Sequence, residues 1–189
     1  MRILGVDPGS SVTGYGVIER MDGRLTHVAH GTLRLPAAES LPERLDLLYR
    51  TMSEVLQGHQ PDCVSVETVF VSASARSALV LGQARGVILA ALAAAGMPVN
   101  EYAPARIKSA VTGNGRATKQ QVKTMVKRLL SLDRMPASDA ADALAAAIAH
   151  ANASRIESLA PRTGARRRPT RPTRPTRPAG SVWHVRRTR

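Results

Sequence analysis

The chain has 189 residues, of which 43% are hydrophobic and one is cysteine, so it is long enough to bury one sizeable core and cannot form an internal disulfide. Its formal net charge of +13 is uneven: residues 161–189 contain ten Arg and no acid, whereas the rest of the chain contains 17 basic and 14 acidic residues. The chain starts without a signal-peptide pattern, and Gly82, Gln83 and Arg85 interrupt its longest apolar run, so we expect a soluble, cytoplasmic protein that does not span a membrane.

Three extended segments are predicted at the start of the chain. Residues 2–7 form an apolar run that ends in an acid, and residues 13–19 resume the strand pattern after the turn sequence PGSS. Residues 25–34 complete the set. The first part of the chain is therefore expected to form a three-stranded meander.

A helix and a further strand come next. Ser40 and Glu43 form a capping-box pattern, apolar residues then recur at helical spacing, and Gly58 is expected to end the helix ahead of Pro61. Residues 62–67 are a second apolar run that ends in an acid. This run is expected to be a buried strand.

The rest of the chain is predicted to be mainly helical. A long helix is expected from about residue 73 to residue 95, and a short strand follows at residues 99–103. Three more helices are expected near residues 104–111, after the Thr118–Gln121 capping box, and after Ser138. Because the strands largely precede the helices, the predicted class is α/β, with a five-stranded mixed sheet flanked by helices.

The last segment has a different composition. The triplet Arg-Pro-Thr repeats three times within it, and few apolar side chains are present to offset the entropy lost on ordering. We therefore expect one folded domain over residues 1–155 and a disordered basic tail over residues 160–189.

Four carboxylates are notable for their positions. Asp7 and Glu67 each end an apolar strand, and if these strands pair in parallel, both carboxylates lie at the same carboxyl-terminal edge of the sheet. Asp139 and Asp142 lie three residues apart on one face of an Ala-rich helix, where like charges repel unless a cation lies between them. Taken singly, each acid also fits a strand end, a turn or a helix dipole. Taken together, they predict a catalytic cluster.

The chemistry of this cluster favours hard cations. Carboxylates without His or Cys partners suit magnesium or manganese and not zinc. Two ions are expected per site, one to activate a water and one to stabilise the leaving 3′ oxygen of a phosphodiester. We therefore predict Asp7, Glu67, Asp139 and Asp142 as catalytic residues and ligands of Mg²⁺, with Mn²⁺ as a substitute.

Four strings carry a family resemblance: GVDPGS with TGYGVI, SVETVF, LGQARG and DAADALA. They occur in this order between about residues 2 and 153, and together they resemble the RuvC family of Holliday junction resolvases. The resemblance implies a ribonuclease-H-like fold and a homodimeric endonuclease that resolves four-way junction DNA in recombination and repair. Paired nicks in two strands of like polarity would leave 5′-phosphate and 3′-hydroxyl ends. The resemblance places the acidic site on the same four carboxylates and implies the RuvA and RuvB branch-migration proteins as partners.

A basic segment separates Glu101 from Asp133, with seven Lys or Arg and no acid between them. Lys119, Lys123 and Lys127 recur at intervals of four beside an apolar helical stripe, an arrangement that also fits an ordinary solvated face. The segment and the resemblance predict DNA contacts at Arg106, Lys108, Arg116, Lys119 and Lys123.

Two further DNA contacts are predicted earlier in the chain, at Phe70 and Arg76. Phe70 follows Glu67 by three residues and fits either a core contact or, by the resemblance, a stacking contact with an unpaired base. Arg76 is expected to contact a phosphate. Gly82 and Gly86 permit close helix approach, and the resemblance assigns their region to the dimer interface.

Other residues are assigned no catalytic role. The string GNGRATK lacks the Gly-Lys-Ser/Thr order of a Walker motif and is interpreted as a basic DNA-facing loop. His150 is expected at a helix end, and Cys63 in a buried strand.

Three other functions fit parts of the sequence. DPGS and GYG also resemble the phosphate loop of actin- and Hsp70-like ATPases, but those enzymes duplicate the domain and this chain has room for one. A non-catalytic junction-binding or nucleoid protein would use only the basic segments. A related nuclease that acts on RNA or simple duplexes would share the acidic site. The tail is expected to add weak, salt-sensitive DNA affinity in any of the nucleic-acid functions.

Overall fold

The computed structural model of the chain describes residues 1–68 and 75–159, with side chains up to Ser154. The strands are β1 (Arg2–Asp7), β2 (Val12–Met21), β3 (Arg24–Arg34), β4 (Cys63–Glu67) and β5 (Val99–Tyr102). The helices are α1 (Leu41–His59), α2 (Ala75–Ala94), α3 (Pro104–Thr112), α4 (Lys119–Leu129) and α5 (Ser138–Leu159). The predicted order of strands and helices is confirmed.

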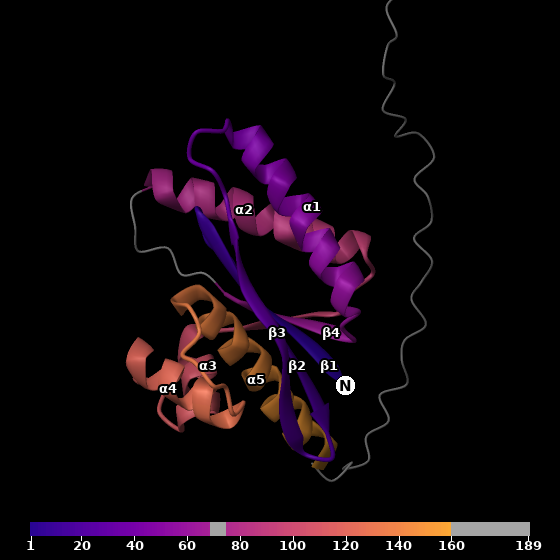
Figure 1. The fold of residues 1–189 in the computed structure, drawn as a ribbon, viewed down its shortest axis with the longest axis vertical. Helices are drawn as coiled ribbons and strands as arrows, with labels where there is room; N and C mark the ends of the chain where they lie inside the picture. The colour runs from indigo at the N-terminus through magenta and orange to yellow at the C-terminus, as the bar shows by residue number, and fades with distance from the viewer. Residues whose placement is uncertain (69–74, 160–189) are drawn as a thin grey trace, which may run out of the picture. The chain divides into compact units, whose positions relative to one another are not determined.

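The strands form one mixed sheet in the order β3-β2-β1-β4-β5. β1, β2 and β3 pair antiparallel as a meander, whereas β4 pairs in parallel with both β1 and β5. In Figure 1, α1 and α2 cover one face of the sheet and α3, α4 and α5 cover the other. The five-stranded mixed sheet flanked by helices is thus confirmed.

Each face of the sheet has its own apolar core, because successive side chains of a strand point to opposite faces. Ile3 of β1 packs with Leu144 and Ile148 of α5, while its neighbour Leu4 packs on the other face with Leu48 of α1. All five side chains are fully buried. The central strands are therefore apolar on both sides, as their unbroken apolar runs predicted.

The end of α1 differs from the prediction. Gly58 does not terminate the helix, which continues to His59 before Gln60 takes a left-handed conformation with φ of 45°. Pro61 disfavours a right-handed helical conformation at the residue before it, so the chain turns at Gln60 instead. Space around Gly58 is open, and nothing there requires a glycine.

α2 is apolar along most of its length. Its buried residues, including Ala84 and Ile88, pack in the same core as Leu48 of α1. By length and composition alone it could cross a membrane, in spite of Gly82, Gln83 and Arg85. Here it is a helix packed on the sheet layer, and Arg85 is ion-paired with Glu101 at 2.6 Å.

Candidate active site

Two of the four predicted carboxylates lie side by side at one edge of the sheet. Asp7 is the last residue of β1 and Glu67 the last residue of β4. The two strands are parallel, with Val6 opposite Val66, so the acids that follow them emerge together. The predicted parallel pairing of these strands is confirmed. The shared edge is the carboxyl-terminal one, where α/β sheets place their ligands.

Helix α5 brings the other two carboxylates to the same edge. The helix lies so close to the sheet that a Cβ atom at Gly5 would collide with the backbone oxygen of Ala143, and one at Gly14 with that of Asp139. The hydroxyl of Ser65, on β4, donates a 2.7 Å hydrogen bond to the Ala146 carbonyl and fixes the helix from beneath. The first turns of α5 therefore lie over the ends of β1 and β2.

A small pocket of about 100 Å³ contains three of the carboxylates: Asp7, Glu67 and Asp142. Lys108 and Lys119 line the same pocket and bring positive charge to it. Its apolar walls are Pro104, Ile107, Val122 and Ala145. Asp139 is half-buried beside this pocket and does not line it. In this arrangement, Asp142 rather than Asp139 shares the pocket with the strand-end acids.

Burial and mutual repulsion govern the protonation of these acids. Burial, followed by the charges of Glu67, Asp142 and Asp139, raises the pKa of Asp7 from its ordinary value of 3.8 to about 7, although Lys119 opposes the shift. Burial and the charge of Asp142 likewise raise the pKa of Glu67. The pocket therefore disfavours an accumulation of negative charge in the absence of a cation.

Lys119 supplies part of the missing positive charge. Its Nζ donates to Oδ2 of Asp142 at 3.3 Å, and the charge of Asp142 raises the pKa of Lys119. The lysine side chain is 75% exposed, whereas the aspartate is only 16% exposed. An exposed ammonium of this kind can move away from the pocket at little cost.

The donor set fits a hard divalent cation. The side chains in the pocket that can bind a metal are carboxylates, with no His or Cys among its lining residues. Within residues 1–68 and 75–159, no three His, Cys, Asp or Glu side chains are close enough together to enclose an ion as they stand.

The predicted DNA contacts occupy several elements. Lys108 and Lys119 reach the pocket, and Lys123 is half-buried one turn after Lys119 on α4. Arg116 is exposed in the turn before α4, where its backbone N–H donates to Asn114. Arg76 is exposed in the first turn of α2, and Phe70 lies outside the described residues.

Arg106 and His150 take part in contacts that sequence patterns did not predict. The guanidinium of Arg106 lies 5.3 Å from the ring centroid of Tyr102, a cation–π contact. His150 is not at a helix end, because α5 continues to Leu159; instead it is buried, with Nδ1 2.8 Å from the Tyr102 hydroxyl. The apolar spacing of α5 was a usable signal for burial of position 150, but nothing in the sequence indicated its partner. Cys63 is buried in β4, as predicted.

The sheet is mixed, two of its central parallel strands end in acids, and a helix packed across the sheet brings further acids to the same edge. This arrangement defines a nuclease of ribonuclease-H-like fold. The family profile described as "Crossover junction endodeoxyribonuclease RuvC" matches residues 3–150. The chain therefore belongs to the RuvC family.

Individual relatives agree with this assignment. The chain is 53% identical over 152 residues to the crossover junction endodeoxyribonuclease RuvC of Cupriavidus metallidurans, which covers 80% of this chain and 84% of that protein. It is 54% identical over 167 residues to the protein of that name from Halorhodospira halophila, and the match covers 88% of this chain and 99% of that protein. Among solved structures, Thermus thermophilus RuvC in complex with Holliday junction substrate superposes with a TM-score of 0.76 at 31% identity, covering 82% of this chain and 96% of the other.

Proposed function

We propose that the chain is a structure-selective endonuclease that resolves Holliday junctions in recombination and repair. Two subunits would make paired nicks in opposed strands and leave 5′-phosphate and 3′-hydroxyl ends. The observation that carries the proposal is the convergence of Asp7, Glu67 and Asp142 in one pocket of a RuvC-family fold, with Lys108 and Lys119 beside them. A relative in this family has been solved with a Holliday junction bound.

The proposed cofactor is magnesium, two ions per subunit, with manganese able to substitute. Asp7, Glu67 and Asp142 would hold the ions, and Asp139 would assist from the side of the pocket. When bound, such ions activate the attacking water, stabilise the leaving 3′ oxygen and offset the charge that develops on the phosphate.

The chain's own residues prepare the site for this reaction. Asp7 must lose its proton to act as a ligand, and burial and its neighbours raise its pKa to about 7. In the absence of substrate, the Lys119 ammonium pairs with the Asp142 carboxylate and offsets its negative charge. If Asp142 served as a metal ligand, Lys119 would be free to bind the phosphate next to the scissile bond, and Lys108 would bind the same phosphate from α3.

The test compares substrates and variants. Asp7→Asn and Glu67→Gln should reduce cleavage of a synthetic four-way junction in magnesium by at least about 1000-fold, because each removes a charge on which the ions depend. Junction binding should be retained or become tighter, since negative charge is lost beside the phosphates. Asp46→Asn, on the exposed face of α1, is the matched control and should cleave normally.

Each rival function has its own outcome in this test. Unchanged cleavage by both variants would overturn the proposed site. Binding without cleavage by the wild-type protein would indicate a non-catalytic junction-binding protein. Preferential cleavage of an RNA–DNA hybrid or a linear duplex would indicate a related nuclease. Tight nucleotide binding in a titration would instead indicate the ATPase alternative.

The proposal includes a homodimer formed through α2. Leu79 is 64% exposed on this helix, and open space surrounds Gly82 and Gly86, so a second copy could pack closely there. A cytoplasmic location and cooperation with the RuvA and RuvB proteins complete the proposal, and both rest on the family relationship.

A further inference from the structure

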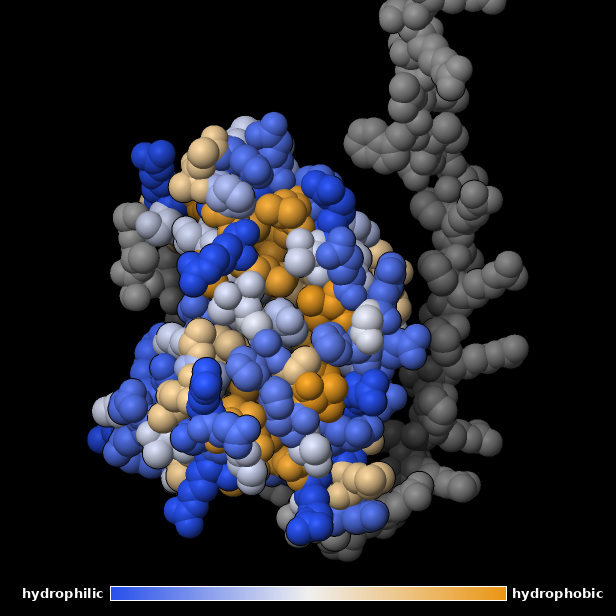
Figure 2. All heavy atoms as spheres, in the orientation of Figure 1, coloured by the Kyte–Doolittle hydropathy of each residue, from blue (hydrophilic) through white to orange (hydrophobic). Residues whose placement is uncertain are grey.

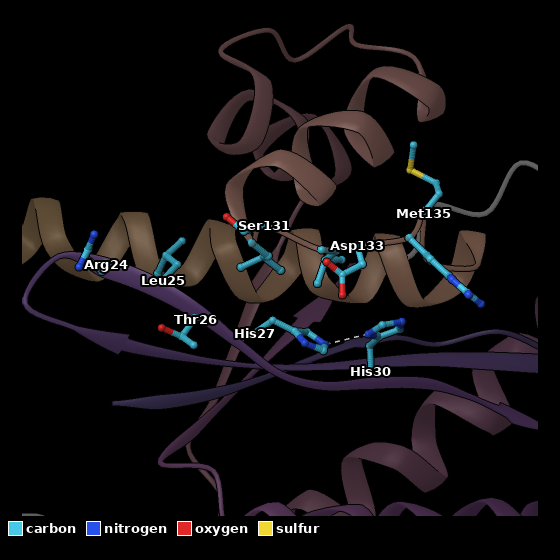
Figure 3. A pocket seen from close by; sticks show the side chains of 11 residues that line it. Arg24, Leu25, Thr26, His27, His30, Ser131, Asp133 and Met135 are labelled. Atoms are coloured by element: carbon cyan, nitrogen blue, oxygen red, sulfur yellow. Dashed lines mark hydrogen bonds between the residues drawn. The ribbon is translucent and has the colours of Figure 1, made fainter.

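A second, larger hollow of about 850 Å³ lies apart from the carboxylate pocket. We call it the β3 groove: one wall is the edge strand β3, and the other is the α4–α5 connection (Figure 3). Its polar lining residues are Arg24, Thr26, His27, His30, Ser131, Asp133 and Arg134. The proposed function uses none of them.

An irregularity in the sheet shapes the groove. The β2–β3 register shifts so that Ile18 pairs with His27 and Val17 with Ala29, which leaves Val28 as the extra residue of a β-bulge. In a regular strand, two residues three apart point to opposite faces. With the bulge between them, His27 and His30 both line the groove, and His27 Nε2 lies 2.8 Å from His30 Nδ1 (Figure 3).

The charge of the lining is suited to an anion. Two guanidinium groups, Arg24 and Arg134, and two imidazoles line the groove together with one carboxylate, Asp133, which points toward the histidines in Figure 3. The Thr26 and Ser131 hydroxyls add neutral hydrogen-bond donors. Guanidinium, imidazole and hydroxyl donors together recognise phosphate oxygens.

Two elements, β3 and α4, run between the groove and the proposed active site. Asp139 packs its backbone oxygen against Gly14 of β2, and Gly14 pairs with Thr32 of β3, two residues from His30. On the other wall, the lysine stripe of α4 begins at Lys119 in the carboxylate pocket, and Leu130, the residue that follows the helix, lines the groove. The basic residues of α4 therefore lie along a helix that runs from the carboxylate pocket toward the groove, and Figure 2 shows many hydrophilic side chains over α3 and α4.

We propose that the β3 groove binds the sugar–phosphate backbone of the junction arm that leads away from the cleaved bond. From Arg24 to His30 the strand extends on the order of 20 Å, at about 3.3 Å per residue. That length corresponds to roughly six base pairs at about 3.4 Å each. The inference rests on the proposed function, because it takes junction DNA as the substrate, and it adds a contact region outside the carboxylate pocket.

The experiment measures junction affinity with catalysis prevented by calcium or by chelation of divalent ions. The double variant Arg24→Ala/Arg134→Ala should bind a four-way junction about tenfold more weakly. The slope of log K against log salt should become shallower by about 1.8, because each lost phosphate contact removes about 0.9. Arg50→Ala, which removes the same charge from an exposed site on α1, is the control and should leave affinity unchanged.

A variant that removes a negative charge, and is therefore expected to change affinity in the opposite direction, tests the role of charge in the groove itself. Asp133→Asn removes the carboxylate among the lining residues and should tighten binding about two- to threefold. A hydroxyl-radical footprint on the same junction should show protected positions in one arm that the double arginine variant exposes. A structural role alone would change thermal stability without this pair of opposite effects on affinity.

The outcomes separate this inference from the proposed function. If the wild-type protein binds the junction and the double variant, the Asp133 variant and the control all match it in affinity and salt slope, the β3 groove does not bind DNA. If affinity changes but the footprint does not, the assignment to a junction arm is wrong. If the wild-type protein fails to bind the junction at all, the proposed function itself fails.

Discussion

At Asp7, burial and the neighbouring carboxylates act in the same direction. Both favour the neutral acid, so the pKa rises from 3.8 to about 7, whereas the unfolded chain would retain the ordinary value. Between these two values the folded protein holds a proton that the unfolded protein has lost. The contribution of Asp7 to the free energy of unfolding of the metal-free protein therefore decreases as pH rises from about 4 to about 7, and levels off above that range.

This pH dependence can be measured as thermal stability in the presence of a chelator. The melting temperature of the wild-type protein should fall by several degrees over that pH range, and Asp7→Asn should flatten the fall because residue 7 no longer titrates. Magnesium should restore stability at the upper end of the range, since it binds the ionised form. A wild-type melting temperature that rises steadily across this window would contradict the assigned direction.

The element that positions the site is α5, and its close packing depends on residues without side chains. Gly5 and Gly14 lie directly beneath the backbone of the helix, so any larger residue there must push the helix away from the sheet. Asp139 and Asp142 would move with it. The glycines of the first two strands therefore belong to the architecture of the site although they carry no chemistry.

Gly5→Ala tests this packing. We expect it to lower the free energy of unfolding by about 3 kcal/mol, at the upper end for overpacking, because the added methyl group meets backbone atoms that cannot rotate away. Gly58→Ala is the matched control: its Cβ meets open space within α1, so it should be neutral or stabilise by up to about 1 kcal/mol. Urea unfolding of both variants gives the comparison, and equal stabilities would contradict the assigned role of Gly5.

At the scale of the whole molecule, the proposed dimer depends on the exposed apolar part of α2. Leu79→Asp should convert the proposed dimer into a monomer in sedimentation experiments, because a carboxylate cannot be buried between two helices without a partner. Since Leu79 is already 64% exposed within one chain, the fold of each subunit should be retained. Met21→Asp is the control: Met21 is 69% exposed and does not belong to α2, so this substitution should leave the assembly unchanged. A dimer that survives Leu79→Asp would place the interface elsewhere.

The basic tail adds a separate electrostatic contribution. Residues 161–189 carry ten of the 27 Lys and Arg, so a chain that ends at Leu159 should bind junctions with a shallower salt dependence than the full chain. It should still cleave them, because the carboxylate pocket lies entirely within the earlier residues. Equal salt slopes for the two lengths would show that the tail does not contact DNA.

Local patterns in the sequence determined most elements and two members of the site. Thr118 and Gln121 exchange the hydrogen bonds of the predicted capping box, at 2.8 and 3.2 Å, because such a cap involves only residues of one turn. Asp7 and Glu67 could be selected because an acid at the end of an apolar strand is conspicuous in any fold. Their chemistry as a pair also followed, once parallel pairing of the two strands was assumed.

Tertiary structure alone decided which groups meet. It placed Asp142 in the pocket and Asp139 beside it, joined His150 to Tyr102, and used a bulge to turn His27 and His30 to the same face. These outcomes depend on strand register and on contacts between segments far apart in the chain. Helical and strand periodicity describe each segment by itself, so the sequence determined which side chains were available, and the packing of α5 and β3 on the sheet decided where they act.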